Sequence, residues 1–253
     1  MSPRETTNAV RTALKIGYQG FDSAQWYENE HQTGTAISSH LSSHPDTPIF
    51  YTTKLRHNAP SLSTSLASIT RSLQSSTLSS ISLLLLHSPL GGRAARLTTW
   101  SAVTSAIKSG QVLSAGVSNY GVKHIEELMV TNPEIKPVVN QIEVHPFNTQ
   151  VAIRECCAKY GILIQAYAPL ARGLRFKHPV IVDLSDKYGC TPAQLMIRWG
   201  LQHGFCVLPK SVHEKRMVEN ADVGWFEISD EDMVRMDGLD EKLVTDWDPT
   251  DAE

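Results

Sequence analysis

The stretch GFDSAQWYENE at residues 20–30 places an aspartate and a tyrosine five positions apart, beside a tryptophan. Asp22 ends a short apolar run, and Tyr27 precedes a segment with helical character. One interpretation is structural, because acidic residues such as Glu30 favour the first turn of a helix. The other is chemical, because a carboxylate and a phenol can carry out acid–base catalysis. Residues elsewhere in the chain must decide between them.

Lys54 and His87 are the next residues that could do chemistry, and each closes an apolar run. A buried Lys–Asp pair beside a phenol favours the ionised phenolate, so the hydroxyl of Tyr27 could donate a proton nearer neutral pH. A neighbouring histidine can orient a carbonyl oxygen toward that hydroxyl. Together these groups can protonate an alkoxide as a hydride reaches the carbonyl carbon. Because no side chain supplies a hydride, the hypothesis requires a nicotinamide cofactor.

The elements that must position these residues follow from the apolar pattern. Short apolar runs alternate with longer periodic segments, which indicates βα units whose parallel strands are buried on both faces. The predicted strands are 20–23, 49–54, 81–86, 112–117, 138–142, 162–167 and 205–208. The predicted helices are 4–16, 28–41, the first part of 61–80 with a serine-rich outer face, 98–109, 121–131, 149–160, 192–203 and 213–221.

Two parallel architectures compete for this pattern. A doubly wound nucleotide-binding fold should carry a G-x-G-x-x-G turn, and no such motif occurs. A (β/α)₈ barrel instead gathers its chemistry at the C-terminal ends of several strands. Polar or aromatic residues with chemical capacity end or follow all seven predicted strands: Asp22, Lys54, His87, Ser118 with Asn119, Gln141, Tyr167 and Lys210. We therefore predict an α/β fold of the (β/α)₈ TIM-barrel type, with residues 1–253 as a single domain.

One barrel strand is missing from the pattern, because only seven are recognisable and a helical segment precedes the first of them. A closed barrel pairs every strand edge, since open edges leave backbone groups unsatisfied. The expectation is an N-terminally truncated barrel whose first strand would lie upstream of Met1. Its open edge should then recruit a second copy of the chain, or be covered by the N-terminal segment.

In order and spacing, several motifs resemble the aldo-keto reductase family, closest to its fungal members, from about residue 5 onward. They are GFDSAQWYENE, FYTTKL at 50–55, LLLLHSP at 83–89, GVSN at 116–119, VNQIEVHP at 139–146, AYAPL at 166–170 and LPKSV with R and EN at 208–220. The resemblance implies a catalytic tetrad of Asp22, Tyr27, Lys54 and His87. Tyr27 would be the general acid, Lys54 would be salt-bridged to Asp22, and His87 would steer the carbonyl.

The resemblance also implies NADP(H) as the cofactor. Ser118, Asn119 and Gln141 match residues that hold the nicotinamide carboxamide, and Tyr167 matches the aromatic that stacks on the ring. Residues matching the adenosine 2′-phosphate and adenine site are Lys210, Ser211, Arg216, Glu219 and Asn220. Cations beside a helix start suit a phosphate, which favours NADP over NAD. Lys215 is better explained as a solvated residue of the same helix.

The substrate side of the site is less specified. Trp26, His87 and Trp100 could line its mouth, although both tryptophans could equally be ordinary packing residues. Such an apolar mouth favours uncharged carbonyl substrates. The family's N-terminal hairpin and first strand have no match here, and the loop RGLRFKHP at 172–179 offers little to wrap a pyrophosphate. An alternative function is therefore a repurposed barrel, either a non-redox acid–base enzyme (isomerase, dehydratase or cyclase) or a cofactor-sensing binding protein.

Composition excludes other classes of protein. The 253 residues are 41% hydrophobic, enough for a sizeable core, and the net charge of −3 gives no general attraction to nucleic acid or anionic membranes. No apolar run approaches the roughly 18 residues that span a bilayer, and the opening segment lacks the apolar stretch of a signal peptide. The cysteines at 156, 157, 190 and 206 show no CxxC spacing. We expect a cytoplasmic protein with small, buried, unpaired cysteines and no metal site.

Overall fold

The computed structural model describes all 253 residues and divides into two compact units. The first unit contains Met1–Asn140 together with Pro249–Glu253, and the second contains Gln141–Asp248. Each unit is described by itself. The single domain predicted from the sequence stays a prediction.

The first unit is built on a parallel sheet with the strand order β1-β2-β3-β4. Its strands are β1 Gly20–Asp22, β2 Phe50–Leu55, β3 Ile81–Leu86 and β4 Val112–Ser118. Five of the six β3 residues are buried apolar side chains, as expected of a parallel strand covered on both faces. Asp22 is the last residue of β1, and its register partner on β2 is Thr52, two residues before Lys54. The sheet therefore brings the two charged residues to the same edge.

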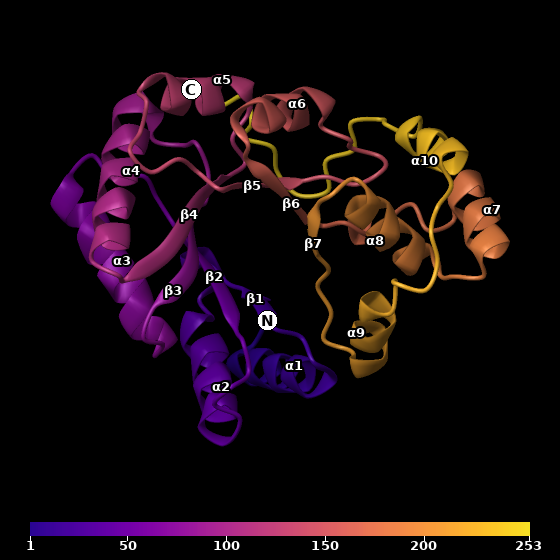
Figure 1. Cartoon of the computed structure of the whole chain (residues 1–253), viewed down its shortest axis with the longest axis horizontal. Coiled ribbons are helices and arrows are strands. Elements are labelled where there is room, and N and C mark those ends of the chain that lie inside the picture. The colour runs from indigo at the N-terminus through magenta and orange to yellow at the C-terminus, as the bar shows by residue number, and fades with distance from the viewer. The chain divides into compact units, whose positions relative to one another are not determined.

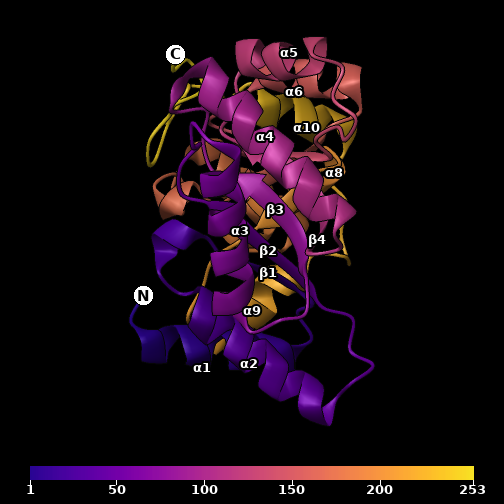
Figure 2. The same ribbon diagram turned by 90° about the vertical axis from the view of Figure 1, so that its left-hand side faces the viewer.

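Helices cover one face of this sheet, as Figures 1 and 2 show for α3 and α4 against β2–β4. Serine caps two of these helices: Ser2 forms a capping box at α1, and Ser61 accepts an N–H of α3. The helical elements are α1 Pro3–Ile16, the 3₁₀ turn η1 Gln25–Tyr27, α2 Glu30–Ser43, α3 Leu62–Ser76, α4 Gly92–Lys108 and α5 Val122–Val130.

The serine-rich helix α3 forms as predicted, but its serines do not all face outward. Ser65, Ser72 and Ser76 are buried. The small side chains allow α2 to approach closely, because a Cβ added at Gly34 would lie only 1.6 Å from the carbonyl oxygen of Ser76. The prediction of a serine-rich outer face is therefore wrong for these three positions.

The second unit contains β6 and β7 as a parallel pair, in which Tyr167 lies opposite Leu208. Strand β5 begins in the first unit and ends in the second. Figure 1 shows α8 beside β7 with α7 and α10 farther out, and α7 packs against both other helices. The elements are β5 Val139–Glu143, α6 Val151–Tyr160, β6 Leu163–Tyr167, η2 Ala171–Gly173, α7 Pro179–Tyr188, α8 Pro192–Gln202, β7 Cys206–Leu208, α9 Glu214–Ala221 and α10 Asp230–Asp237.

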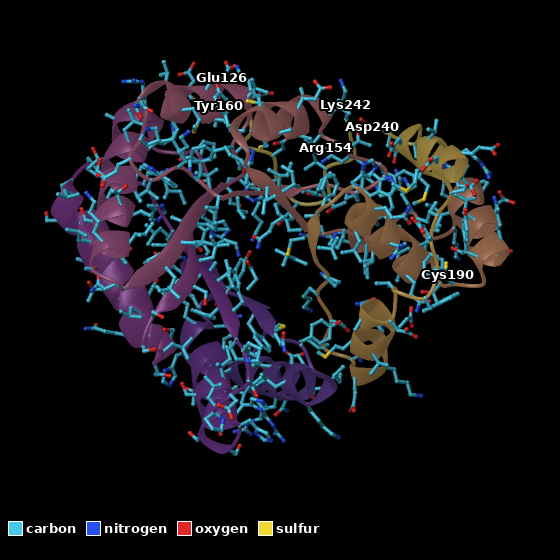
Figure 3. The ribbon with its side chains drawn as sticks, viewed as in Figure 1. Glu126, Arg154, Tyr160, Cys190, Asp240 and Lys242 are labelled. Atoms are coloured by element: carbon cyan, nitrogen blue, oxygen red, sulfur yellow. The ribbon has the colours of Figure 1, made fainter.

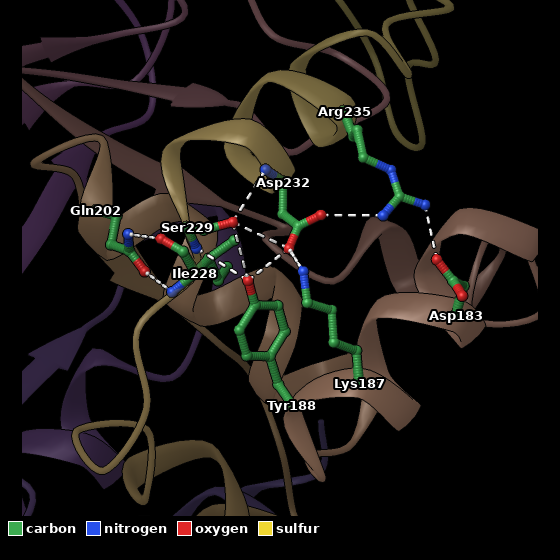
Figure 4. Close-up of polar contacts among 8 residues, drawn as sticks. All are labelled: Asp183, Lys187, Tyr188, Gln202, Ile228, Ser229, Asp232 and Arg235. Atoms are coloured by element: carbon green, nitrogen blue, oxygen red, sulfur yellow. Dashed lines mark hydrogen bonds and ion pairs between the residues drawn. The ribbon is translucent and has the colours of Figure 1, made fainter.

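Asp232 is buried and anchors helix α10 to α7 through a cluster of polar contacts (Figure 4). Its carboxylate accepts hydrogen bonds from Lys187 Nζ at 2.5 Å, Tyr188 Oη at 2.6 Å and Arg235 Nη1 at 2.9 Å. Burial opposes ionisation, but these donors outweigh it and hold the pKa of Asp232 below its ordinary value. Ser229 caps the helix by accepting the Asp232 N–H, so Asp232, in the first turn of α10, has a structural role.

Most predicted elements are confirmed, and three details differ. All seven strands are present, with boundaries that match the predicted ones to within one residue. Helix α4 begins at Gly92 instead of 98, and α7 and α10 have no counterpart among the predicted helices. None of the four cysteines forms a disulfide. Cys156 and Cys157 are buried and Cys190 is partly buried, but Cys206 is exposed, so its prediction as a core residue is wrong. None of the helices combines the length and the apolar character needed to cross a membrane.

Candidate active site

The four residues of the predicted tetrad lie together in the first unit. Lys54 Nζ contacts Asp22 Oδ1 in an ion pair, donates to the carbonyl oxygen of Ser23 at 2.9 Å and lies 3.5 Å from Tyr27 Oη. The rings of Tyr27 and His87 meet edge to face, with centroids 5.6 Å apart. Lys54 is fully buried, whereas 47% of Tyr27 is exposed. The arrangement presents a phenol to solvent with a buried cation behind it.

The backbone places these side chains at one edge of the sheet. Asp22 ends β1, Lys54 is the penultimate residue of β2, and His87 directly follows β3. Its N–H donates to the carbonyl oxygen of Leu55 at 3.3 Å, which continues the strand pairing by one residue. Tyr27 is held in the 3₁₀ turn η1, whose last residue is followed by Glu28 at φ 53°. Sharp turns of this kind direct a side chain out of the path of the strand.

Gln25 fixes the turn that carries Tyr27, and nothing in the sequence singled it out. Its amide nitrogen donates to Ser68 O at 3.1 Å and Ser72 Oγ at 2.9 Å on α3. Its amide oxygen accepts the N–H of Arg56 at 2.8 Å, just after β2. The turn is therefore fastened both to a helix and to the strand that carries Lys54.

Glu30, the acid of the opening stretch, supports the site without joining it. It is the first residue of α2, is 7% exposed, and accepts the hydroxyl of Thr53 at 2.6 Å. This is the structural interpretation of an acid in the first helical turn. The hydrogen bond ties α2 to β2 beside Lys54.

The two basic residues of the tetrad, Lys54 and His87, differ in protonation state. Burial disfavours the charged form of Lys54, but the carboxylate of Asp22 and the hydroxyl of Tyr27 outweigh it and raise the pKa of Lys54. Burial, with a smaller contribution from the charge of Lys54, lowers the pKa of His87 to about 3. Lys54 is thus a cation and His87 a neutral imidazole, whose Nδ1 is buried without a hydrogen-bond partner.

The two tryptophans predicted at the mouth have different surroundings. Trp26 is partly buried, and its ring lies 4.7 Å from that of His87 and 6.0 Å from that of His57. Trp100 lies on α4, is 3% exposed and donates its indole N–H to the carbonyl oxygen of Ile135 at 2.9 Å. Trp26 therefore borders the tetrad, whereas the contacts of Trp100 match the packing alternative.

Two of the predicted nicotinamide-binding residues lie at the end of β4. Ser118 and Asn119 are both buried, and Asn119 adopts a left-handed backbone with φ 60°. The Asn119 amide donates to the carbonyl oxygen of His87 at 2.9 Å and to Ser118 Oγ at 3.2 Å. These bonds join the turn after β4 to the residue that orients the carbonyl in the hypothesis.

The other predicted nicotinamide-binding residues belong to the second unit. Gln141 lies in the middle of β5, not at its end, and donates to Gln165 Oε1 on β6 at 2.9 Å. Gln165 was not among the predicted residues, although it shares the polar, buried character of Gln141. Tyr167 is the last residue of β6, as predicted, and is partly buried.

The predicted phosphate and adenine residues gather at helix α9. Lys210 and Arg216 are exposed, before and within its first turn. The N-cap residue, His213, makes no side-chain cap, and its own N–H donates to Ser211 Oγ at 3.1 Å. Two exposed cations at an uncapped helix start form a donor set suited to a phosphate. Glu219 accepts the hydroxyl of Thr191 at 2.7 Å, and Asn220 is buried.

A separate hollow in the second unit, with a volume of about 560 Å³, contains none of the predicted residues. Arg154, labelled in Figure 3, lies on its wall with His203, Phe205 and Asp237. The Arg154 guanidinium lies 4.8 Å from the centre of the Phe205 ring and donates to His203 Nδ1 at 3.0 Å, while His203 Nε2 contacts Asp237 at 2.8 Å. The polar groups on the wall thus bind one another. Because its lining contains no predicted site residue, the hollow is separate from the predicted site.

Comparison with known proteins gives consistent results for sequence and structure. Residues 1–241 match the model of the Aldo/keto reductase family. An uncharacterized oxidoreductase of Schizosaccharomyces pombe is 42% identical over 96% of this chain and 87% of its own length. Glyoxal reductase of Bacillus subtilis is 38% identical over 93% of this chain and 83% of its own.

Among solved structures, the aldo-keto reductase of Bombyx mori in complex with NADP has a TM-score of 0.90 at 30% identity. The match covers 97% of this chain and 86% of that one. The aldose reductase of Schistosoma japonicum has a TM-score of 0.88 at 30% identity, over 95% and 86% of the two chains. The predicted (β/α)₈-barrel fold class, with seven strands in this chain, is confirmed.

The neutral state of His87 predicts how stability depends on pH. The unfolded chain takes up a proton near the ordinary pKa of 6.5, whereas the folded chain does so only near 3. As the pH falls below 6.5, the unfolded state is stabilised, and the unfolding free energy should fall until about pH 3. Urea unfolding between pH 7.5 and 4.5 should show a steeper loss for the wild type than for His87→Gln, which has no titrating ring. Parallel losses would contradict a buried neutral His87.

Proposed function

Because the chain belongs to the aldo-keto reductase family, we propose that it reduces aldehyde, ketone or ketoester carbonyls with NADPH, with Tyr27 as the proton donor. Membership makes the chain an NADP-dependent oxidoreductase that acts on carbonyl groups. The observation that carries the role of Tyr27 is its contact with Lys54. The phenol lies 3.5 Å from a buried ammonium that is ion-paired with Asp22.

Each tetrad residue has a defined task in this proposal. NADPH, when bound, supplies the hydride for the carbonyl carbon. The hydroxyl of Tyr27 donates its proton to the carbonyl oxygen as negative charge develops there. Lys54 stabilises the phenolate that remains, because its ammonium is held in a buried position. Asp22 keeps Lys54 charged.

His87 orients the substrate in this scheme. A neutral imidazole carries one N–H, which can donate to a carbonyl oxygen without competing for the proton that Tyr27 delivers. The low pKa of His87 supports this role, since an imidazolium would offer a second acid beside the phenol. Trp26, packed against the His87 ring, would border the bound substrate. Trp100 remains a predicted substrate contact whose indole is already hydrogen-bonded.

The residues present fit the cofactor at both ends. We assign Ser118, Asn119 and Gln141 to the nicotinamide carboxamide and Tyr167 to the face of the ring. Lys210, Ser211 and Arg216 would bind the 2′-phosphate at the uncapped start of α9, next to Glu219 and Asn220. The free charge of Lys210 and Arg216 supports NADP over NAD, since a 2′-hydroxyl gives those cations nothing to neutralise.

Glyoxal is a suitable probe substrate, because one relative is named a glyoxal reductase. A partly exposed Tyr27 beside Trp26 supports small, uncharged carbonyl compounds as the substrate class. A chain that binds NADPH tightly but reduces neither glyoxal nor an aromatic aldehyde would favour the cofactor-sensing alternative.

Replacing Tyr27 by phenylalanine tests the proton donor. The variant should lose about 100- to 10,000-fold in kcat for glyoxal, since it lacks only the hydroxyl. Its affinity for NADPH, measured by quenching of tryptophan fluorescence, should stay within about threefold, because the hydroxyl takes no part in cofactor binding. Equal losses of turnover and affinity would mean that Tyr27 is a structural residue.

Replacing Lys210 by alanine tests the 2′-phosphate assignment. Hydrogen bonds to charged groups contribute about 1.5–3 kcal/mol, so NADPH should bind at least about tenfold more weakly, while NADH binding changes little. Lys215→Ala is the matched control. Lys215 is an exposed lysine within α9, and its replacement should leave both affinities unchanged. Parallel weakening of NADPH and NADH by Lys210→Ala would refute the assignment.

A further inference from the structure

The turn between β4 and α5, residues 118–121, connects the cofactor to the catalytic residues in the proposed function. We call it the Asn119 turn. Asn119 has a left-handed backbone, which is uncommon for a residue other than glycine and needs support from its surroundings. Its amide donates to the carbonyl oxygen of His87. Any movement of this turn therefore displaces the predicted nicotinamide ligands relative to His87.

Asn140 supports the turn from the sheet. Its amide nitrogen donates to the carbonyl oxygen of Tyr120 at 2.8 Å, and its amide oxygen accepts the N–H of the same residue at 3.4 Å. Asn140 is fully buried on β5. One side chain thus holds both backbone groups of the residue that follows Asn119.

The C-terminal segment, residues 249–253, supports the turn from the opposite end. We call this segment the strap. It belongs to the first unit although the second unit separates it in sequence. A Cβ added at Gly121 would lie 2.1 Å from the carbonyl oxygen of Thr250, so the strap rests directly on the glycine. Lys123 Nζ donates to the carbonyl oxygen of Asp251 at 2.6 Å.

His124 links the strap to the turn through both ring nitrogens. Nδ1 accepts the N–H of Gly121 at 3.1 Å, so Nε2 carries the proton and donates to the carbonyl oxygen of Ala252 at 2.6 Å. His124 is 1% exposed. Every contact of the strap described so far uses one of its main-chain carbonyls, and together they fix the residue where the Asn119 turn ends and α5 begins.

We propose that the strap positions the Asn119 turn for the nicotinamide end of NADP(H). This inference rests on the proposed function. Ligands that hold a reactive ring must be fixed to within about 0.5 Å. The strap gives the turn a second point of attachment, which limits movement of Ser118 and Asn119 relative to His87. The strap residues act through the turn, so they are positioning residues and not catalytic ones.

Gly121→Ala is the first test, because φ at this position is −80° and alanine fits the backbone. Its methyl group would collide with Thr250 and displace the strap. NADPH should bind about fivefold or more weakly, whereas 2′,5′-ADP, which lacks the nicotinamide, should bind within about twofold of wild type. Gly224→Ala is the matched control, since a Cβ there has no neighbour within 4 Å and φ is not positive.

Two substitutions of His124 separate strap contact from helix capping. His124→Asn keeps an oxygen that can accept the Gly121 N–H but cannot reach the strap, so it should behave like Gly121→Ala. His124→Gln can still donate to Ala252 and should retain more NADPH affinity than His124→Asn. Neither substituted side chain titrates, so the NADPH affinities of the two variants can be compared at a single pH.

Three outcomes overturn the inference. NADPH affinity could be unchanged in both Gly121→Ala and His124→Asn. NADPH and 2′,5′-ADP affinities could fall in parallel, which would indicate general loss of structure. Failure of the cofactor assignment in the proposed function is distinguishable, because the wild-type chain itself would then not bind NADPH, and both proposals would be overturned.

Discussion

The buried ammonium of Lys54 needs a counter-charge, and the predicted tetrad of the first unit is arranged around that requirement. Removing a charge from water costs several kcal/mol, so a fully buried lysine persists only with a counter-charge and further acceptors. Asp22 supplies the charge, the carbonyl oxygen of Ser23 accepts a hydrogen bond, and Tyr27 completes the environment. The parallel pairing of β1 with β2 brings these groups together. In the proposed mechanism, the cation that Asp22 balances in the folded chain also stabilises the Tyr27 phenolate.

Much of this arrangement could be predicted because its signals are local. Apolar runs mark parallel strands, and polar residues at their ends mark the edge where chemistry collects. The strand at 20–23, observed as Gly20–Asp22, and the run 81–86, observed unchanged, are two examples. The predicted tetrad followed from the same rule, since Asp22, Lys54 and His87 each lie within one residue of the C-terminal end of a strand. Their meeting with Tyr27 needed only the order of the strands.

The supporting contacts could not be predicted, because they join residues far apart in sequence and produce no periodic pattern of residue types along the chain. Gln25 bridges to α3 over more than 40 positions, and His124 reaches Ala252 over 128. Helix α7 was missed although Pro179 and Gly189 mark its ends. Cys206 was assigned to the core from residue type alone, but β7 leaves it exposed. Long-range hydrogen bonds and exposure are decided by tertiary packing, which residue patterns do not encode.

Turnover by the doubly substituted chain Asp22→Asn, Lys54→Met tests the central claim most directly. Replacing a buried ion pair by groups of similar volume is often neutral or stabilising, so the variant should fold with a melting temperature near that of the wild type. The account predicts that this folded chain binds NADPH and reduces glyoxal about 100-fold more slowly or worse, because nothing stabilises the Tyr27 phenolate. Reduction at the wild-type rate by the folded variant would contradict it.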